Sequence, residues 1–102
     1  MIEHLCVYRV RKTPDADIEN EIVRLFQELR GDLEGLLEMS VGINTTEEVE
    51  YLKGYTVGLR MLFDSRRSLR NYLEHPKHKA VADFVLRSVD DVIVCDFEVR
   101  SI

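Results

Sequence analysis

Hydrophobic positions recur with two periods along the chain, and the changes of period divide it into strands and helices. Residues 2–12, 37–43 and 55–63 alternate between apolar and other positions, and residues 92–99 are almost continuously apolar. Alternation is typical of a half-buried strand, whereas a continuous apolar run is typical of a strand covered on both faces. The pattern therefore predicts four β-strands.

Helical spacing fills the intervals between the first and second strands and between the third and fourth. Thr13-Pro14-Asp15 predicts a helix start, with a cap residue before a proline at the first helical position, and Gly31 ends this helix. The polar segment 44–54 is predicted to be a connection with one turn of helix begun at Thr45 or Thr46.

The second helical region begins at Asp64-Ser65 and is broken in two at His75-Pro76. A residue before proline is pushed away from helical geometry, so the chain is expected to leave the helix there. The helix restarts at Pro76 and is expected to close at Asp90-Asp91. The element order is therefore β-α-β-β-α-β, with the second helix in two pieces.

This order predicts a ferredoxin-like α+β fold, a four-stranded antiparallel sheet with helices on one face, in a single domain of residues 1–102. The first and last strands, however, are apolar at both odd and even positions. A sheet with one face in water alternates more cleanly, and large exposed apolar patches are rare on monomers. We therefore expect a homodimer in which two sheets pack face to face.

Charge and composition exclude several classes of function. The chain has a net charge of −5, and no cluster of Lys and Arg suited to phosphates stands out, so no nucleic-acid partner is expected. No segment is long and apolar enough to cross a bilayer, and the first residues do not resemble a signal peptide, so we expect a cytoplasmic protein without membrane contact. Cys6 and Cys95 lie in apolar runs and are expected to be free thiols that behave as small hydrophobes.

Candidate chemistry gathers at the helix break, where two of the three histidines lie, and at His4 on the first strand. Pro76 places His78 in the first turn of a helix, where the helix dipole disfavours a positive imidazole. A neutral imidazole can serve as a general base near pH 7. Tyr72 lies on the preceding apolar stripe and could bring its hydroxyl to the same cavity as a donor to a carbonyl oxygen.

Each of these residues also has a structural interpretation. His75 before proline is expected to cap or pack, His78 could be a core histidine with its hydrogen bonds satisfied, and Tyr72 could be a core tyrosine. His75 and His78 lack a third ligand at any recognisable spacing, so no metal site is expected. The sequence has no P-loop and no dinucleotide-binding motif, and no cofactor is expected.

At these residues the chain resembles the stress-responsive α/β-barrel (Dabb) domain family, within the dimeric α+β barrel superfamily. The matching segments run in order along nearly the whole chain, and the one at the helix break is the most specific. They are Ile2-Glu3-His4, Val41-Gly42-x-Asn44, Gly54-Tyr55-Thr56, Tyr72-Leu73-x-His75-Pro76-x-His78 and Val94-x-Asp96-Phe97.

The resemblance implies a homodimer whose two sheets close a barrel. Some plant members that resemble this domain cyclise polyketides without a cofactor, using residues that match His78 and Tyr72. In that scheme His78 removes a proton next to a carbonyl and Tyr72 hydrogen-bonds the developing oxyanion. The family often has histidine where this chain has Val57, so the resemblance implies a more apolar pocket wall and a different ligand, or none.

The hypothesis favoured from the sequence is a small-organic-molecule pocket between helices and sheet, with His4, His75 and Val57 as binding residues. Whether His78 and Tyr72 also catalyse a reaction is left open. The alternative is a non-catalytic, stress-associated dimeric module that binds a partner through its surface. Cofactor-free oxygenation rests on fold analogy alone and ranks last.

Charge suggests one property of the expected pocket. The second half of the chain is net positive, and five basic residues flank the helix break, so they could form an entrance for an anionic or enol-forming ligand. They are Arg66, Arg67, Arg70, Lys77 and Lys79.

Overall fold

The structure, a computed structural model, describes residues 1–31 and 33–100. Ser101 and Ile102, the last residues of the predicted domain, lie outside this part. The elements follow the order expected from the sequence, with the second helix in two pieces. They are β1 (Ile2–Val10), α1 (Ala16–Glu28), β2 (Leu36–Ile43), a 3-10 turn η1 (Val49–Tyr51), β3 (Tyr55–Phe63), α2 (Arg66–Glu74), α3 (Pro76–Ser88) and β4 (Val89–Glu98).

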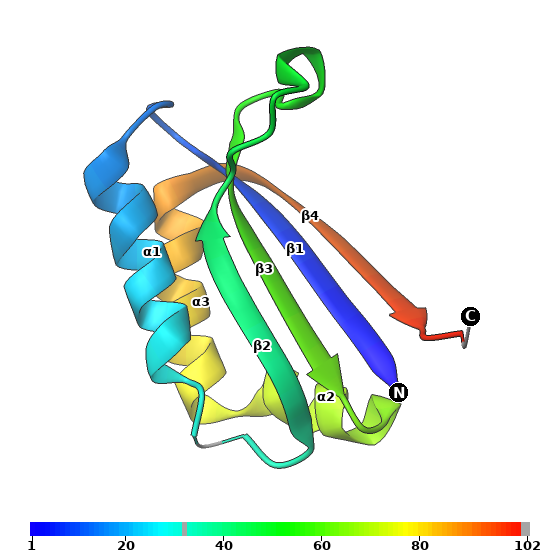
Figure 1. The fold of residues 1–102 in the computed structure, drawn as a ribbon. Coiled ribbons are helices and arrows are strands. Elements are labelled where there is room, and N and C mark those ends of the chain that lie inside the picture. The colour runs from blue at the N-terminus through cyan, green and yellow to red at the C-terminus, as the bar shows by residue number, and fades with distance from the viewer. Residues whose placement is uncertain (32, 101–102) are drawn as a thin grey trace.

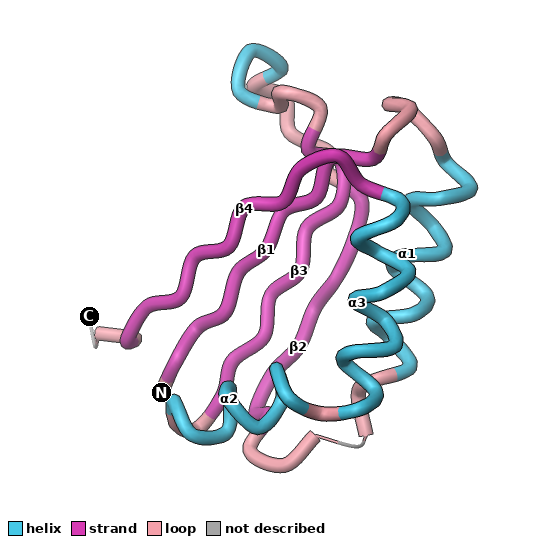
Figure 2. The backbone as a smooth tube through the Cα atoms, turned by 180° about the vertical axis from the view of Figure 1, so that it is seen from behind, coloured by secondary structure: helices cyan, strands magenta, loops and turns pink. Residues whose placement is uncertain are grey.

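The four strands form one antiparallel sheet in the order β2-β3-β1-β4, which confirms the ferredoxin-like α+β prediction. Figures 1 and 2 show α1, α2 and α3 on the same side of this sheet. The sheet therefore has a helix-covered face and an open face. Alternate residues of each strand belong to alternate faces, because side chains of a strand point to opposite sides in turn.

The core lies between the helix-covered face and the helices. In β1 this face carries His4, Cys6 and Tyr8, all less than 10% exposed. Their partners across the sheet are also on this face: Met61, Leu59 and Val57 on β3, and Asp96, Val94 and Val92 on β4. α1 closes the core with Ile22 and Phe26, and the Phe26 ring stacks on Tyr8 at 5.7 Å between ring centroids.

Helix α1 begins later than the sequence pattern predicts. Asp15, rather than Thr13, is the N-cap, and its carboxylate accepts a hydrogen bond from the backbone N–H of Ile18 at 3.2 Å. A carboxylate satisfies the free amides of a first helical turn as well as a hydroxyl does. Pro14 consequently lies before the helix, after a cis peptide bond.

Strand boundaries differ from the prediction at three places. β1 ends at Val10 rather than residue 12. In β2 the pairing with β3 is irregular between Leu36 and Glu38, so Leu36 pairs with Phe63 and Leu37 is 52% exposed. β4 begins at Val89, and Asp90 and Asp91 lie within the strand rather than closing α3, because Arg9 on the neighbouring strand β1 and Tyr55 on β3 bind their carboxylates.

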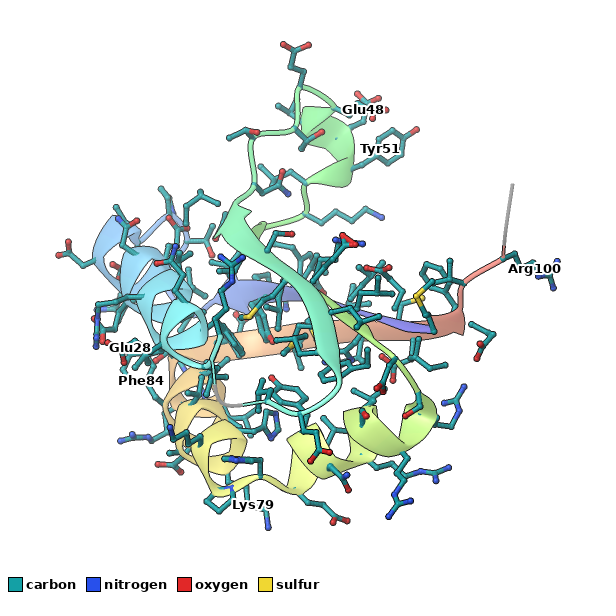
Figure 3. All side chains as sticks on the ribbon, turned by 60° about the horizontal axis from the view of Figure 1, so that its bottom comes forward. Glu28, Glu48, Tyr51, Lys79, Phe84 and Arg100 are labelled. Carbon is teal, nitrogen blue, oxygen red and sulfur yellow. The ribbon has the colours of Figure 1, made fainter. Side chains whose placement is uncertain are left out.

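The connection between β2 and β3 projects beyond the end of the sheet (Figure 1). Its short helical turn is η1, which begins at Val49 rather than at Thr45 or Thr46. The Thr46 hydroxyl instead accepts a hydrogen bond from the Glu48 backbone N–H in the preceding turn. Tyr51 and Glu48 lie at the tip of this projection (Figure 3), and Tyr51 is 67% exposed.

The open face carries apolar side chains that no helix covers. Ile93 and Phe97 on β4 are 50% and 44% exposed, beside the half-buried Leu5 and Val7 on β1. Gly42 on β2 pairs with Gly58 on β3, and the missing side chains leave a shallow hollow of about 460 Å³ on this face. The prediction that both faces of β1 and β4 are apolar is therefore confirmed.

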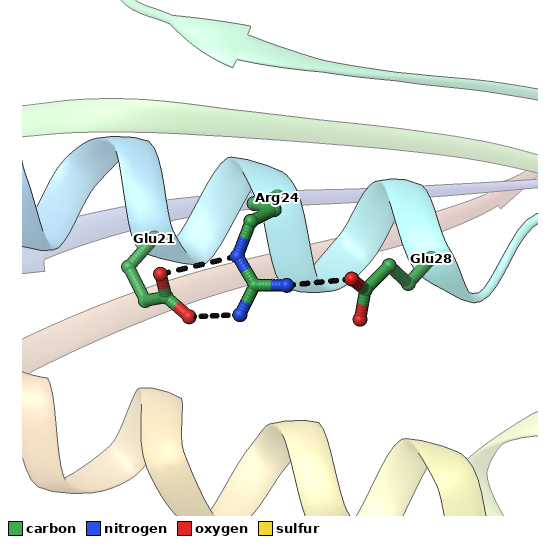
Figure 4. Close-up of polar contacts among 3 residues, drawn as sticks. All are labelled: Glu21, Arg24 and Glu28. Carbon is green, nitrogen blue, oxygen red and sulfur yellow. Dashed lines mark hydrogen bonds and ion pairs between the residues drawn. The ribbon is translucent and has the colours of Figure 1, made fainter.

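The acidic exposed side of α1 is partly neutralised within the helix. Arg24 lies between Glu21 and Glu28 and hydrogen-bonds to both carboxylates (Figure 4). Residues three and four apart lie on the same side of a helix, so one guanidinium reaches both. No helix in residues 1–31 and 33–100 is long and apolar enough to span a bilayer.

Candidate functional site

A cavity of about 360 Å³ lies between the sheet and the helices, beside the helix break. Its walls combine apolar side chains with a few polar groups, which is the usual character of a site for a small organic molecule. The apolar lining consists of Phe26, Leu73, Ala82, Val85, Leu86, Val92 and Val94. The polar lining consists of His4, Cys6, Tyr8, Tyr72, His78 and Asp96.

The helix break places Tyr72 and His78 against each other. Tyr72 lies in the last turn of α2 and His78 in the first turn of α3, and their ring centroids are 4.5 Å apart in an edge-on arrangement. The break is fixed by His75-Pro76: His75 has extended backbone and Pro76 takes the first helical position. Pro76 therefore turns the chain so that two side chains from successive helices face one cavity.

The hydrogen bonding of His78 determines which ring nitrogen is free. Its Nδ1 lies 3.0 Å from the backbone oxygen of Leu73. A carbonyl oxygen only accepts, so Nδ1–H is the donor, and in the neutral ring Nε2 carries the lone pair. Partial burial lowers the pKa of His78, with smaller contributions from His4 and Lys79, against the opposing effect of the Leu73 carbonyl. Nε2 is therefore a base that stays unprotonated near neutral pH.

The Tyr72 hydroxyl is a neutral donor. The side chain is 2% exposed, and burial raises the pKa of its phenol well above the ordinary value. Among residues 1–31 and 33–100 no group accepts a hydrogen bond from this hydroxyl. A protonated phenol without an internal acceptor can donate to a ligand oxygen in the cavity.

His4 lies on the strand wall of the cavity, opposite the helices. Its Nδ1 is 2.6 Å from Oδ1 of Asp96 on the neighbouring strand β4, and its Nε2 is 3.3 Å from Sγ of Cys6. The His4 and Tyr72 ring centroids are 6.0 Å apart. The structure thus brings together His4, Tyr72 and His78, three of the residues that the sequence selected.

Cys6, Tyr8 and Asp96 were not selected from the sequence as site residues. Cys6 and Tyr8 follow His4 at the same parity of β1, so the alternation of a strand could have placed them on the same wall. Asp96 could be found only by knowing that β1 pairs with β4 in the register that sets His4 opposite Asp96. Single-sequence patterns do not fix such a register.

Two other predicted binding residues, His75 and Val57, do not line this cavity. His75 accepts a hydrogen bond from the Lys77 backbone N–H through Nδ1 at 3.0 Å, so it caps α3. Val57 is fully buried on the helix-covered face, opposite Tyr8, and does not belong to the cavity lining. Both lie close to the site, and a ligand-binding role for either stays a prediction.

The predicted basic entrance is not present in the cavity walls. None of its five Lys and Arg residues belongs to the lining. Lys79, for example, points away from the sheet (Figure 3). The exposed lining residues are instead the apolar Leu73, Leu86 and Val94, at 39%, 60% and 54% exposure, together with the acidic Asp96. The mouth of the cavity is therefore mainly apolar with one carboxylate, and the five basic residues are exposed outside it.

Metal ligation was tested on the same side chains. In the described part of the chain, no group of three or more His, Cys, Asp and Glu side chains is placed to hold a metal ion.

The chain is similar to a known protein family and to several solved structures. A family model described as the stress-responsive A/B barrel domain (Dabb) matches residues 2–99. No curated protein has a matching sequence.

Three solved structures are similar over nearly the whole chain. A protein from Arabidopsis thaliana is 22% identical, with a TM-score of 0.85 and coverage of 100% of this chain and 98% of that one. A dimeric ferredoxin-like protein of unknown function from Jannaschia sp. CCS1 is 25% identical, with a TM-score of 0.83 and coverage of 96% and 98%. A hydroxynitrile lyase from Passiflora edulis is 16% identical, with a TM-score of 0.84 and coverage of 99% and 94%.

Proposed function

Because the chain belongs to the stress-responsive A/B barrel family, we propose that it is a homodimer whose cavity binds a small organic carbonyl compound, and that His78 and Tyr72 act on that compound without a cofactor. The observation that carries the proposal is the pairing of a free base with a free donor. His78 Nε2 and the Tyr72 hydroxyl lie on adjoining rings at the wall of one apolar cavity.

In the proposed chemistry, His78 Nε2 takes a proton from the carbon next to the carbonyl. The electron pair moves onto the carbonyl oxygen, and the Tyr72 O–H donates a hydrogen bond to that developing oxyanion. The Leu73 carbonyl stabilises the resulting imidazolium through Nδ1–H. The enolate can then attack a second carbonyl of the same molecule, as in an aldol closure, or regain a proton.

The cavity supports an apolar ligand of modest size. Most of its lining is aliphatic or aromatic, and its mouth carries leucine and valine. Transfer of apolar surface from water contributes about 25 cal/mol per Å² buried, so such a ligand gains its affinity mainly from contact with these walls. The few polar groups then orient the carbonyl.

The dimer is supported by the open face of the sheet and by relatives described as dimeric. Burial of Ile93 and Phe97 against a second copy would cover two exposed apolar side chains on that face. The hollow left by Gly42 and Gly58 can receive a side chain of the partner.

A non-catalytic module that binds a partner is the second candidate. The observation that favours it is the projecting turn η1, where Val49 and Tyr51 are 70% and 67% exposed. Exposed apolar side chains on a projection are suited to contact with another protein. The two candidates differ in whether His78 moves protons.

Exchange of the methyl protons of acetophenone in D2O tests the proposal, because it requires only proton removal next to a carbonyl. The protein is expected to accelerate loss of the methyl signal in proton NMR. Replacing His78 by Gln should lower the protein-dependent rate by about 100-fold or more, and Tyr72→Phe should lower it by about 100-fold.

Arg87→Gln is the matched control, since it changes an exposed residue at the other end of α3 that does not line the cavity. Its exchange rate should stay close to that of the unchanged protein. Exchange that is no faster than in buffer, or that is equally lost in Arg87→Gln, would contradict the proposal. Thermal unfolding of each variant shows whether the fold is kept.

A further inference from the structure

The strand wall of the cavity carries a second set of reactive groups that the proposed chemistry does not use. Cys6, His4 and Tyr8 lie at alternate positions of β1, and Asp96 lies beside His4 on β4. All four line the cavity. The side chains of Cys6, His4 and Asp96 form a continuous run of contacts, in which Cys6 hydrogen-bonds to His4 and His4 to Asp96.

At the Asp96 end of this run, the donor and the acceptor of the hydrogen bond can be assigned. Asp96 lies 2.6 Å from His4 Nδ1, and a carboxylate accepts, so Nδ1–H donates to it. In the neutral ring Nε2 is then the acceptor, and the group within reach is the Cys6 thiol at 3.3 Å. The Asp96 side chain is 30% exposed, which keeps its charge in contact with water.

A nucleophile, a base that receives its proton and a carboxylate that orients the base are the three parts of an activated thiol site. Burial raises the pKa of the Cys6 thiol to about 11, so this sulfur is a thiol at neutral pH and needs a base at the moment of attack. His4 is placed to be that base. Cys95, the other free cysteine, is exposed and pairs with Leu5, a residue of the open face.

We propose that Cys6, His4 and Asp96 form an acyl-transfer centre on the strand wall of this cavity, which accepts the acyl group of a small ester. Cys6 and His4 are the catalytic residues and Asp96 is a positioning residue. The proposal rests on the proposed function in one respect, since the cavity has to admit a small organic molecule. It is independent of proton removal by His78.

The step balances without a co-reactant. Cys6 Sγ attacks the acyl carbon while the thiol proton moves to His4 Nε2, and the imidazolium is stabilised by Asp96 through Nδ1–H. The negative oxygen of the tetrahedral intermediate can accept a hydrogen bond from the Tyr72 hydroxyl, which has no acceptor among the described residues. The intermediate collapses as the bond to the leaving oxygen breaks, and His4 returns the proton to that oxygen. The product is a thioester on Cys6.

p-Nitrophenyl acetate is a suitable probe, because the released nitrophenolate is coloured and the acetyl group stays on the protein. The experiment uses a Cys95→Ser variant, so that Cys6 is the sole thiol. Trypsin cleavage after Arg9 gives the peptide of residues 1–9, and tandem mass spectrometry locates the acetyl group within it. We expect acetylation at Cys6, with the release of one nitrophenolate per protomer in the first phase.

His4→Gln in the same background should lower the rate of Cys6 acetylation by about 100-fold or more, since it removes the base. Asp96→Asn should lower the rate by about tenfold or more, because the imidazole keeps a partner but loses the carboxylate. If His4→Gln fails to fold, Asp96→Asn still tests the acyl-transfer centre. Asp96 lies at the margin of the cavity and is more exposed than His4, so its substitution disturbs the core less.

Cys6→Ala is the matched control, since it leaves exposed Cys95 as the sole thiol. Acetylation of Cys95 should not depend on His4. An acetyl group found elsewhere but not on Cys6, or Cys6 acetylation that His4→Gln and Asp96→Asn leave unchanged, would overturn the inference. If acetophenone exchange persists under that result, the proposed function stands and only the acyl-transfer centre is wrong; if both activities are absent, both proposals fail.

Discussion

Both faces of the sheet carry apolar side chains, but the helices cover those of only one face (Figure 1). On the helix-covered face of β1, His4, Cys6 and Tyr8 point into a cavity that the helices leave unfilled. On the open face, Leu5 and Val7 are half-buried beside the exposed Ile93, and no helix packs over them. Alternation in one strand therefore assigns the proposed chemistry to one face and the proposed association to the other. A hydrophobic residue on this strand cannot be interpreted until its face is known.

The largest effect is expected for a substitution in the core, on the helix-covered face. It tests whether packing on this face is sufficient to stabilise the protomer. Phe63 is fully buried there, with its ring 5.5 Å from that of Tyr72. Phe63→Ala should lower the free energy of unfolding by about 3–5 kcal/mol, because it removes a large buried side chain and leaves a cavity. Urea unfolding measures the loss, which should not depend on protein concentration.

Phe97→Ala is the matched change on the open face, where the side chain is 44% exposed. Its effect should be smaller in dilute protein and should grow with concentration, since the stabilisation comes from a second copy. Equal losses for the two variants at every concentration would show that the faces do not differ in this way.

A second experiment addresses association directly. Ile93→Glu places a charge on the open face, opposite Val7. Burial of an unpaired carboxylate is costly, so the dimer should dissociate at least about tenfold more readily. Analytical ultracentrifugation over a concentration series measures this. Val49→Glu, on the projecting turn, is the control and should leave association unchanged.

The smallest expected effect concerns the pH dependence of stability. The pKa of His78 is lowered in the folded protein, mainly by burial, so the unfolded chain binds the proton more readily. Stability should therefore be complete above the unfolded pKa of about 6.5 and fall as the pH drops below it. His78→Gln should remove this part of the pH dependence, as measured by urea unfolding from about pH 8 to 5.

The groups that influence the pKa of His78, besides its burial, are His4, Lys79 and the Leu73 carbonyl. His75→Gln serves as the comparison, because His75 caps α3 outside the cavity. The same pH dependence in His78→Gln and in the unchanged protein would mean that His78 is not the group responsible.

Periodicity was sufficient for the fold because each element has a strong local signal. Pro76 alone indicates the helix break, and the apolar stripe of α1 is continuous from Ile18 to Leu29. The errors in the predicted element boundaries occur where contacts with other strands determine where a strand begins or ends. Asp90 and Asp91 look like a helix stop, yet Arg9 and Tyr55 hold them in β4. Leu37 fits the alternation but is displaced by the irregular pairing before Glu38.

The candidate site was predictable only in part for the same reason. Tyr72 and His78 are neighbours in sequence, so the helix break is enough to bring them together. The pairs His4–Asp96 and Cys6–His4 depend on strand register and on which side chains share a wall, and no local pattern specifies either. The basic residues flanking the break are close in sequence but face solvent. The cytoplasmic location inferred from the sequence stays a prediction.

The pairing of β1 with β4 has a consequence for biosynthesis. His4 is separated from Asp96 by 92 residues, nearly the full length of the chain. A ribosome exposes β1 first and β4 last, so a nascent chain can form α1, the β2–β3 hairpin and the helix break while His4 still lacks its carboxylate. Contacts between distant segments form slowly, since loop closure precedes them. The strand wall of the cavity is therefore completed only when synthesis has passed residue 96, and a chain stopped before β4 exposes an unpaired edge of β1.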